Sequence, residues 1–361
     1  MSEVVNIPQL RFPEFSDAWE EKNVGDVLTI GSGRDYKHLN NGDIPVYGTG
    51  GYMTSVDSFL YDGESVCIGR KGTIDKPVLI DGKFWTVDTL FYTHSFVDLL
   101  PKFLFPLFKR INWKKYNEAS GVPSLSKSTI EKIKLSLPTK PEQQKIAAFL
   151  TTVDSKIEQL SKKQELLKEY KKGLMQQIFS QATRFKADDG CDFPDWEEKK
   201  LGDVSVRGTS NISANQLEDN NGDYKIYGAA GHLKNIDFYT EEDCYVAIVK
   251  DGAGVGRIML LESKTSVLGT LAIIKAKQGN DINFLYWLIQ TINFRKYVVG
   301  STIPHIYYRD YQAEKLRIPS LSEQAKIASF LSSIDNKIEQ VGKQLVESKQ
   351  FKKALLQQMF V

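Results

Sequence analysis

Cysteine is scarce in this chain of 361 residues, and so are long apolar runs and any surplus of charge. The three cysteines are odd in number and widely separated, so neither a disulfide framework nor a zinc site is expected, and a reducing cytoplasm suits the chain. No apolar run approaches the ~18 residues that cross a bilayer. With 47 basic and 45 acidic side chains the net charge is only +2, so a nucleic-acid-binding role requires the basic groups to gather on one face.

Catalytic motifs are also missing. The sequence has no Gly-x-x-x-x-Gly-Lys-[Ser/Thr] phosphate loop and no Asn-Pro-Pro-aromatic motif of an amino-methyltransferase. Gly252, Gly254 and Gly256 have the wrong spacing for a dinucleotide loop and indicate a turn. The acidic run before Lys199 is too compact to place carboxylates on adjacent strands around a metal ion, and the four histidines lack metal-ligand spacings. No catalytic residue, metal ligand or bound cofactor is therefore predicted in this chain.

The chain instead contains a long internal duplication, in which residues 142–179 return as 323–360 at an offset of 181 without a gap. Twenty of those 38 paired positions are identical. Upstream, the segment 19–27, which begins Trp-Glu-Glu-Lys, returns as 196–204. Solenoid repeats span ~20–50 residues, so this much longer period indicates tandem duplication of a whole domain with an attached helix. A molecule with pseudo-twofold symmetry is predicted.

The first part of each copy, 6–138 and 192–319, predicts a mostly-β globular domain of the α+β class. Turns rich in glycine, asparagine and aspartate separate short β-branched or aromatic runs, and 64–69 and 244–249 are predicted strands. A short helix is predicted near the end of each globular part, at 99–115 and 282–298.

The second part of each copy predicts a long helix with a coiled-coil seam. Apolar residues recur in alternating steps of three and four, which is a 3.5-residue period over five heptads, and Gln164, Lys171, Ser348 and Lys352 fill the gaps. At 1.5 Å per residue each helix is about 57 Å long. A single helix of this kind also suits a dimerisation element or a long surface helix, whereas two copies in one register favour pairing within the chain. The predicted seam residues are Ile146, Leu150, Val153, Ile157, Leu160, Leu167, Leu174, Ile178, Ile327, Leu331, Ile334, Ile338, Val341, Leu345, Leu355 and Met359.

Three paired features together span nearly the whole chain: the segments beginning at Arg11 and Phe193, the two Trp-Glu-Glu-Lys-x-[Val/Leu]-Gly-Asp-Val starts, and the two Glu-Gln-x-Lys-Ile-Ala-x-Phe-Leu helices. In these features the chain resembles the specificity subunits of type I restriction-modification systems. The resemblance implies two target-recognition domains that each read one half of a bipartite DNA site, and two helices that act as a ruler for the unread spacer. The implied limits are 1–140 and 181–321 for the recognition domains and 141–180 and 322–361 for the helices.

The same resemblance implies partners that carry the chemistry. Two modification subunits would methylate adenine with S-adenosylmethionine, and two restriction subunits would use ATP and Mg²⁺, so this chain itself would be catalytically silent. Two partner subunits on a duplex are most simply related by a twofold axis perpendicular to the DNA, which requires the two helices to run in opposite directions. The predicted fold class is therefore α+β, with two mostly-β target-recognition domains of pseudo-twofold symmetry, joined and separated by two long helices in an antiparallel coiled coil.

DNA contact requires cations for phosphates and planar polar groups for base edges. Such groups gather in loops at matching places of the two copies, and these loops are basic in both copies while their details differ. That pattern is expected when one scaffold reads two different half-sites. The predicted DNA-contact residues are Arg34, Lys37, His38, Arg70, Lys71, Lys114, Lys115, Lys127, Arg207, Asn211, Lys250, Arg257, Arg295, Lys296, His305 and Arg309.

Two other functions stay open from the sequence. In one, the coiled coil makes the chain a scaffold whose domains bind protein. In the other, the chain is a freestanding DNA-modifying enzyme. Binding of DNA with and without a methyltransferase partner separates these alternatives from a specificity subunit.

Overall fold

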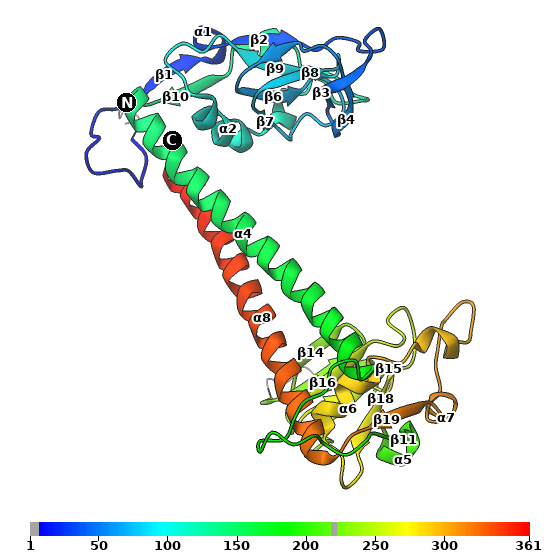
Figure 1. The fold of residues 1–361 in the computed structure, drawn as a ribbon. Helices are drawn as coiled ribbons and strands as arrows, with labels where there is room; N and C mark the ends of the chain where they lie inside the picture. The colour runs from blue at the N-terminus through cyan, green and yellow to red at the C-terminus, as the bar shows by residue number, and fades with distance from the viewer. Residues whose placement is uncertain (1–6, 218–221) are drawn as a thin grey trace. The chain divides into compact units, whose positions relative to one another are not determined.

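The structure is a computed structural model that describes residues 7–217 and 222–361. The chain divides into two compact units, unit 1 formed by residues 1–162 with 342–361 and unit 2 formed by residues 163–341. Each unit holds one β-rich domain and half of each long helix, so the unit boundaries fall inside the helices (Figure 1). We call the β-rich parts domain 1 (7–139) and domain 2 (180–217 and 222–320). None of the helices in the described residues is both long enough and apolar enough to span a membrane.

Domain 1 is built around a central strand, β6, that is buried at every position. Val66 and Ile68 on one face pack into the main core, whereas Cys67 on the other face packs against the second sheet. This burial raises the pKa of the Cys67 thiol to about 12, so the thiol stays protonated at neutral pH. In sheet order the strands are β2 (Thr29–Ser32), β9 (Leu90–His94), β6 (Ser65–Gly69) and β7 (Val78–Ile80), then β4 (Gly51–Val56), β3 (Asn41–Gly48), β8 (Lys83–Thr86) and β5 (Tyr61–Asp62), and finally the pair β1 (Glu20–Asn23) and β10 (Lys134–Leu137).

Domain 2 repeats this plan, except that its described residues include a 3-10 turn, η2 (Ala214–Gln216), and form no counterpart of β5. Its central strand β15 is likewise fully buried, and it pairs with β18 and β16 as β6 pairs with β9 and β7. In sheet order the strands are β12 (Ser205–Thr209), β18 (Leu271–Ala276), β15 (Tyr245–Val249) and β16 (Ile258–Leu261), then β14 (Gly231–Ile236), β13 (Tyr224–Gly228) and β17 (Ser266–Val267), and the pair β11 (Glu197–Lys200) and β19 (Lys315–Ile318). The predicted strands at 64–69 and 244–249 are confirmed by β6 and β15. A short apolar run between turn residues suits a strand that is covered on both faces.

The short helices near the end of each domain are shorter than predicted. The helix expected at 99–115 ends at Arg110, and a separate 3-10 turn follows, because Ile111 is extended and the indole of Trp113 folds back to donate to the Phe108 carbonyl at 2.8 Å. The helix expected at 282–298 is split in the same way. The short helical elements are α1 (Val24–Val27), α2 (Pro101–Arg110), η1 (Trp113–Tyr116) and α3 (Lys127–Glu131) in domain 1, and α5 (Leu201–Val204), η2 (Ala214–Gln216), α6 (Ile282–Ile289), η3 (Phe294–Tyr297) and α7 (Tyr308–Tyr311) in domain 2.

The two long helices, α4 (Lys140–Phe179) and α8 (Leu321–Gln358), have 40 and 38 residues. In unit 1 the first turns of α4 share a core with the end of the chain, where Ile146 lies in one cluster with Leu355. In unit 2 the last turns of α4 share a core with the first turns of α8, where Ile178 lies in one cluster with Ile327. The helices therefore pack together in opposite directions (Figure 1), and the predicted fold class is confirmed.

Both ion pairs at the gaps of the apolar seam join the two helices. Lys171 donates to Asp335 at 2.5 Å in unit 2, and Lys352 pairs with Asp154 in unit 1, which is the same contact at an offset of 181. All sixteen predicted seam residues are buried or half-buried. Polar side chains within an apolar seam restrict the register in which two helices pair, because a shifted register leaves them without partners.

A buried glutamate in the first turn of α4 attaches that helix to domain 1. Glu142 is 1% exposed, and it accepts two hydrogen bonds of 2.7 Å from Arg11 and one of 3.4 Å from the indole of Trp19. The neighbouring Gln143 is also buried and hydrogen-bonds the carbonyls of Asp98 and Pro138. Breaking a buried ion pair by removing one partner typically costs about 3–5 kcal/mol. The Glu-Gln pair that opens each duplicated helix is therefore an anchor.

Domain 2 has the same anchor. Glu323 accepts hydrogen bonds from Arg184 at 2.8 Å and from the Trp196 indole at 3.1 Å. The counterpart of Arg11 is therefore Arg184, which lies outside the segment that begins at Phe193. Arg184 and Trp196 are 12 residues apart, whereas Arg11 and Trp19 are 8 apart.

Candidate nucleic-acid interface

In domain 1 the turn after the central strand β6 is bound by backbone hydrogen bonds to the loop that precedes α3. The Leu125 N–H donates to the Arg70 carbonyl at 2.9 Å, and the Gly72 N–H donates to the Pro123 carbonyl at 2.8 Å. Gly72 has a φ of +87°, in the left-handed region that favours glycine. We call these two joined loops, 70–72 and 117–127, the loop clamp of domain 1.

Domain 2 forms an equivalent loop clamp from residues 250–252 and 298–309. The Ile306 N–H donates to the Lys250 carbonyl at 2.9 Å, and the Gly252 N–H donates to the Pro304 carbonyl at 2.9 Å. Gly252 has a φ of +91°. The hydrogen bonds that join the turn to the second loop are therefore the same in both domains, while the side chains that the clamps carry differ.

Three predicted DNA-contact residues, Arg70, Lys71 and Lys127, line one cleft of about 380 Å³ at the domain 1 clamp. The Arg70 guanidinium lies over the Phe91 ring at 5.9 Å and reaches the Asp88 carbonyl at 3.4 Å. With three cations converging on one opening, the cleft attracts an anion. The other residues that line it are Ser32, Phe91, Glu118, Ser124, Leu125 and Ser126.

Glu118 adds an acceptor to this cleft. The hydroxyls of Thr129 and Ser126 donate to its carboxylate and hold the pKa of Glu118 below its usual value. The carboxylate is therefore ionised at neutral pH, and the cleft presents both donors and an acceptor. Base edges in the major groove carry both kinds of group, so such a mixed lining suits base contact as well as phosphate contact.

The domain 2 clamp carries different chemistry on the same frame. Asp251 occupies the place of Lys71, and Tyr307 the place of Ser126. The Arg309 guanidinium lies over the Tyr307 ring at 4.7 Å, and the His305 and Tyr307 rings are 5.0 Å apart. Of the predicted residues, the structure thus brings Lys250, His305 and Arg309 to this clamp.

Other predicted residues lie outside the domain 1 cleft. Arg34, Lys37 and His38 are exposed on the segment after β2, where the Trp85 indole donates to the Arg34 carbonyl at 2.8 Å. Lys114 is paired with Asp75 at 3.2 Å, so a phosphate contact has to replace that pair. Lys115 is exposed beside it in η1.

The remaining predicted residues of domain 2 are also spread over its surface. Lys296 is paired with Glu314 at 2.7 Å, and this hydrogen bond raises the pKa of Lys296. Arg257 donates to the Ala229 carbonyl at 2.6 Å. The last three, all exposed, are Arg207, Asn211 and Arg295.

Sequence reasoning missed one polar residue of the clamps, Glu118, whereas Ser126 and Tyr307 belong to the polar loops at 120–127 and 301–309 that the sequence assigned to DNA contact. Ser126 had a local signal, since it is the N-cap of α3 and accepts from the Thr129 N–H at 3.2 Å. Glu118 had no such signal, because its role depends on a loop that meets it from a distant part of the chain.

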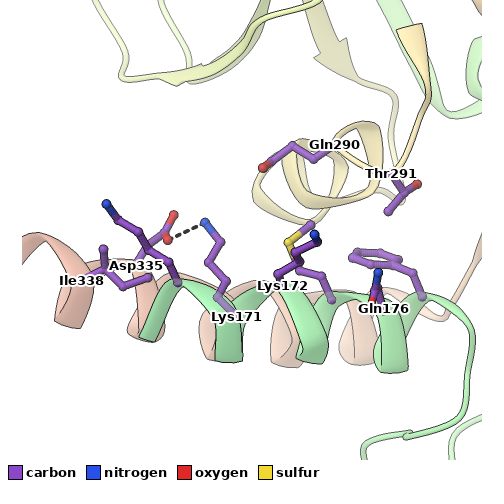
Figure 2. A pocket seen from close by; sticks show the side chains of 10 residues that line it. Lys171, Lys172, Gln176, Gln290, Thr291, Asp335 and Ile338 are labelled. Atoms are coloured by element: carbon purple, nitrogen blue, oxygen red, sulfur yellow. Dashed lines mark hydrogen bonds and ion pairs between the residues drawn. The ribbon is translucent and has the colours of Figure 1, made fainter. Parts of the chain in front are cut away.

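A second repeated feature is a groove beside the paired helices in each unit. In unit 2 it lies between α6 and the helices, has a volume of about 580 Å³ and contains the Lys171–Asp335 pair (Figure 2). In unit 1 a groove of about 200 Å³ beside α2 contains the equivalent Lys352–Asp154 pair. Lining positions equivalent at the offset of 181 are Asp154 and Asp335, Lys352 and Lys171, Leu356 and Met175, and Lys109 and Gln290.

The chain matches the family described as "Type I restriction modification DNA specificity domain" twice, over residues 16–169 and 194–348. These two matches cover most of the chain and coincide with its two copies. The chain belongs to this family. It is a DNA-recognition subunit with two tandem specificity domains, and specificity subunits are not the catalytic components of their systems.

Two similar proteins are specificity subunits of Methanocaldococcus jannaschii. The chain is 26% identical to the type I restriction enzyme MjaVIII specificity subunit, over 82% of this chain and 76% of that one. It is 23% identical to the MjaIX specificity subunit, over 94% of this chain and 91% of that one. The crystal structure of the S subunit from M. genitalium has the same fold, with a TM-score of 0.73 at 17% identity over 98% of this chain and 99% of that one. Among the described residues of this specificity subunit, no three His, Cys, Asp or Glu side chains are grouped to hold a metal ion.

Proposed function

We propose that each domain reads one half of a bipartite DNA site with its loop clamp, and that the paired helices set the length of the unread spacer. The observation that carries this proposal is that matching backbone hydrogen bonds join the two loops of each clamp, while the polar side chains on these loops differ. A common frame places both clamps alike on DNA, while different donors and acceptors select different bases.

The proposal assigns a base-reading role to Arg70 and a phosphate role to Lys127. Arg70→Ala is expected to cost about 1–3 kcal/mol of binding to the recognised site and to relax one position of the motif. Lys127→Ala is expected to weaken binding to all sequences alike and to flatten the salt dependence, because one counterion fewer is released. Fluorescence anisotropy over a salt series, with the site first identified by methylome sequencing, measures both effects.

A matched control for this experiment is Lys134→Ala, which removes an exposed lysine that pairs with Glu21 away from the clamp. Its affinity and salt slope are expected to equal those of the unaltered protein. Unchanged affinity in both Arg70→Ala and Lys127→Ala contradicts this placement of the DNA-binding face.

The proposal also assigns partners. Two modification subunits, which carry S-adenosylmethionine, would bind the two equivalent grooves, and two restriction subunits with ATP and Mg²⁺ would complete the nuclease in the cytoplasm. Support for two copies of one partner comes from the repetition of the same groove in both units of a single chain. Twofold-related subunits require such repeated surfaces. No cofactor is assigned to this subunit.

Charge reversal in the larger groove tests the partner assignment. Lys168 and Lys172 line it and are exposed, so Lys168→Glu with Lys172→Glu is expected to weaken binding of the modification subunit at least tenfold and to leave DNA binding unchanged. The matched control reverses Lys156 and Lys163, which are exposed on α4 outside the lining of that groove. Titration calorimetry with the modification subunit measures the effect, and equal affinities of both double variants exclude this groove as the docking site.

A further inference from the structure

The two loop clamps expose an aliphatic side chain at the same position. Val122 in domain 1 is 66% exposed and Ile303 in domain 2 is 64% exposed, and the two are equivalent at the offset of 181. Each is followed by the proline whose carbonyl accepts a hydrogen bond from the turn after the central strand. Single exposed aliphatic residues are common on proteins, but recurrence at the same loop tip in two diverged domains calls for a physical reason.

Both tips are held in fixed positions. The loop of domain 1 is closed by a hydrogen bond from the Glu118 N–H to the Ser124 carbonyl at 3.0 Å, and the side chain of Asn117 accepts from the Ser124 N–H at 2.9 Å. The equivalent bond in domain 2, from the Val299 N–H to the His305 carbonyl, is 2.9 Å long. A loop closed at its neck and bound at the following proline presents its tip with little loss of entropy on binding.

The domain 2 loop has a further restraint at Gly300, whose φ is +88°. A Cβ at this position would lie 2.5 Å from the Ile303 carbonyl oxygen, so the chain can follow this path only with glycine. The path that projects Ile303 outward is therefore specified by the sequence.

Comparison of the two copies separates the tip from the base-reading residues. The loops read Ala-Ser-Gly-Val-Pro at 119–123 and Gly-Ser-Thr-Ile-Pro at 300–304, so serine, a β-branched aliphatic residue and proline are kept. In contrast, the flanking positions change from Lys71 to Asp251 and from Ser126 to Tyr307. Residues that read different bases have to differ between the domains, whereas a contact that is independent of sequence can stay the same.

We infer that Val122 and Ile303 enter a groove of the DNA duplex beside each half-site and make an apolar contact that does not read the sequence. The inference rests on the proposed function, because Lys71 and Lys127 supply the attraction for phosphates next to the Val122 tip. Sugars and base edges offer apolar surface inside the grooves, and proteins use aliphatic side chains there. Contact with this surface removes the exposed methyl groups of the tip from water.

The test uses the full chain and a fluorescein-labelled 40-base-pair duplex of arbitrary sequence, because the contact does not depend on sequence. Val122→Ala and Ile303→Ala are each expected to lower affinity about fivefold to tenfold, with the same loss on a second unrelated duplex. The slope of log affinity against log salt concentration is expected to stay unchanged, since no cation is removed. Val97→Ala, which shortens another exposed valine of domain 1, is the matched control and is expected to change nothing. Circular dichroism melting checks that all variants are folded.

Lys71→Ala and Lys127→Ala in the same assay separate the two possible failures, because both lysines line the domain 1 cleft and neither is assigned to base reading. If these two variants weaken binding while Val122→Ala and Ile303→Ala do not, the tip inference is wrong and the proposed DNA face stands. If none of the four changes affinity, the proposed face itself is wrong. A loss confined to one of the two duplexes, or a loss seen only in binding of a modification subunit, also overturns the inference, since the tips would then read bases or contact protein.

Discussion

Replacing residues 11–138 with a second copy of residues 184–319 is expected to yield a specificity subunit that recognises an inverted repeat. Both clamps would then carry the side chains of domain 2 and read its half-site. Because α4 and α8 pack in opposite directions, the two copies face opposite strands of the duplex, and the motif becomes symmetric. The half-site read by domain 1 is thus replaced entirely, whereas the half-site read by domain 2 is retained.

The structure explains why the transplanted domain should dock in the place of domain 1. Both segments begin with the arginine that binds the anchoring glutamate of the following helix. Domain 2 also receives Phe179 from the end of α4, where the rings of Trp196 and Phe284 lie 6.4 and 6.0 Å away. Domain 1 receives the equivalent Phe360, and its ring centroid lies 6.2 Å from that of Trp19. Both domains thus pack a phenylalanine from the end of a long helix against an equivalent tryptophan.

Methylome sequencing of cells that express the variant with the modification subunit measures this prediction. The reverse replacement, in which residues 184–319 are exchanged for 11–138, is the matched control and should give an inverted repeat of the other half-site. Retention of the parental asymmetric motif contradicts the assignment of one half-site to each domain. A change in both half-sites at once contradicts it equally.

Local sequence patterns were sufficient for the long helices and the central strands. Both helices follow a 3.5-residue apolar period over many turns, and β6 and β15 are short apolar runs between turn residues, so the signal for each element lies within the element itself. The antiparallel direction of the two long helices was predicted from pseudo-twofold symmetry. That symmetry is visible in the sequence because the segment that begins at Glu142 is repeated from Glu323. These features depend on few contacts between distant residues.

The loop clamp could not be predicted in the same way. It joins Arg70 to Leu125 by a backbone hydrogen bond, and no periodic pattern links two loops that are 55 residues apart in sequence. The sequence placed Arg70 and Lys71 on one turn and Lys127 on a distant loop, and only the fold brings the three to one cleft. Similarly, the end of α2 at Arg110 depends on the tertiary position of Trp113, whereas the local sequence continues to favour a helix.

Lengthening both helices by one heptad, after Leu160 and after Val341, is expected to lengthen the spacer of the recognised site. Seven residues restore the same helix face, so the apolar seam continues through the insertion. Both insertions lie within two residues of the boundaries between the units, at 162 and 341, so neither core is disturbed. The paired helices grow by roughly 10 Å. At ~3.4 Å per base step this admits up to about three additional base pairs, while the bases read at both ends stay the same.

Three additional base pairs turn the second half-site by roughly 100° around the duplex axis, which strains docking of the partner subunits. DNA binding therefore tests whether the helices set the spacer length more directly than methylation does. The affinity of the purified subunit is therefore measured on oligonucleotides that contain both half-sites with graded spacers. Inserting the heptad into α4 alone is the control, since the ion pairs Lys171–Asp335 and Lys352–Asp154 cannot then both form in one register. That variant is expected to lose the spacer optimum instead of shifting it. An optimum that stays at the parental spacing in the double insertion, with helical content raised as designed, shows that the helices do not set the spacer.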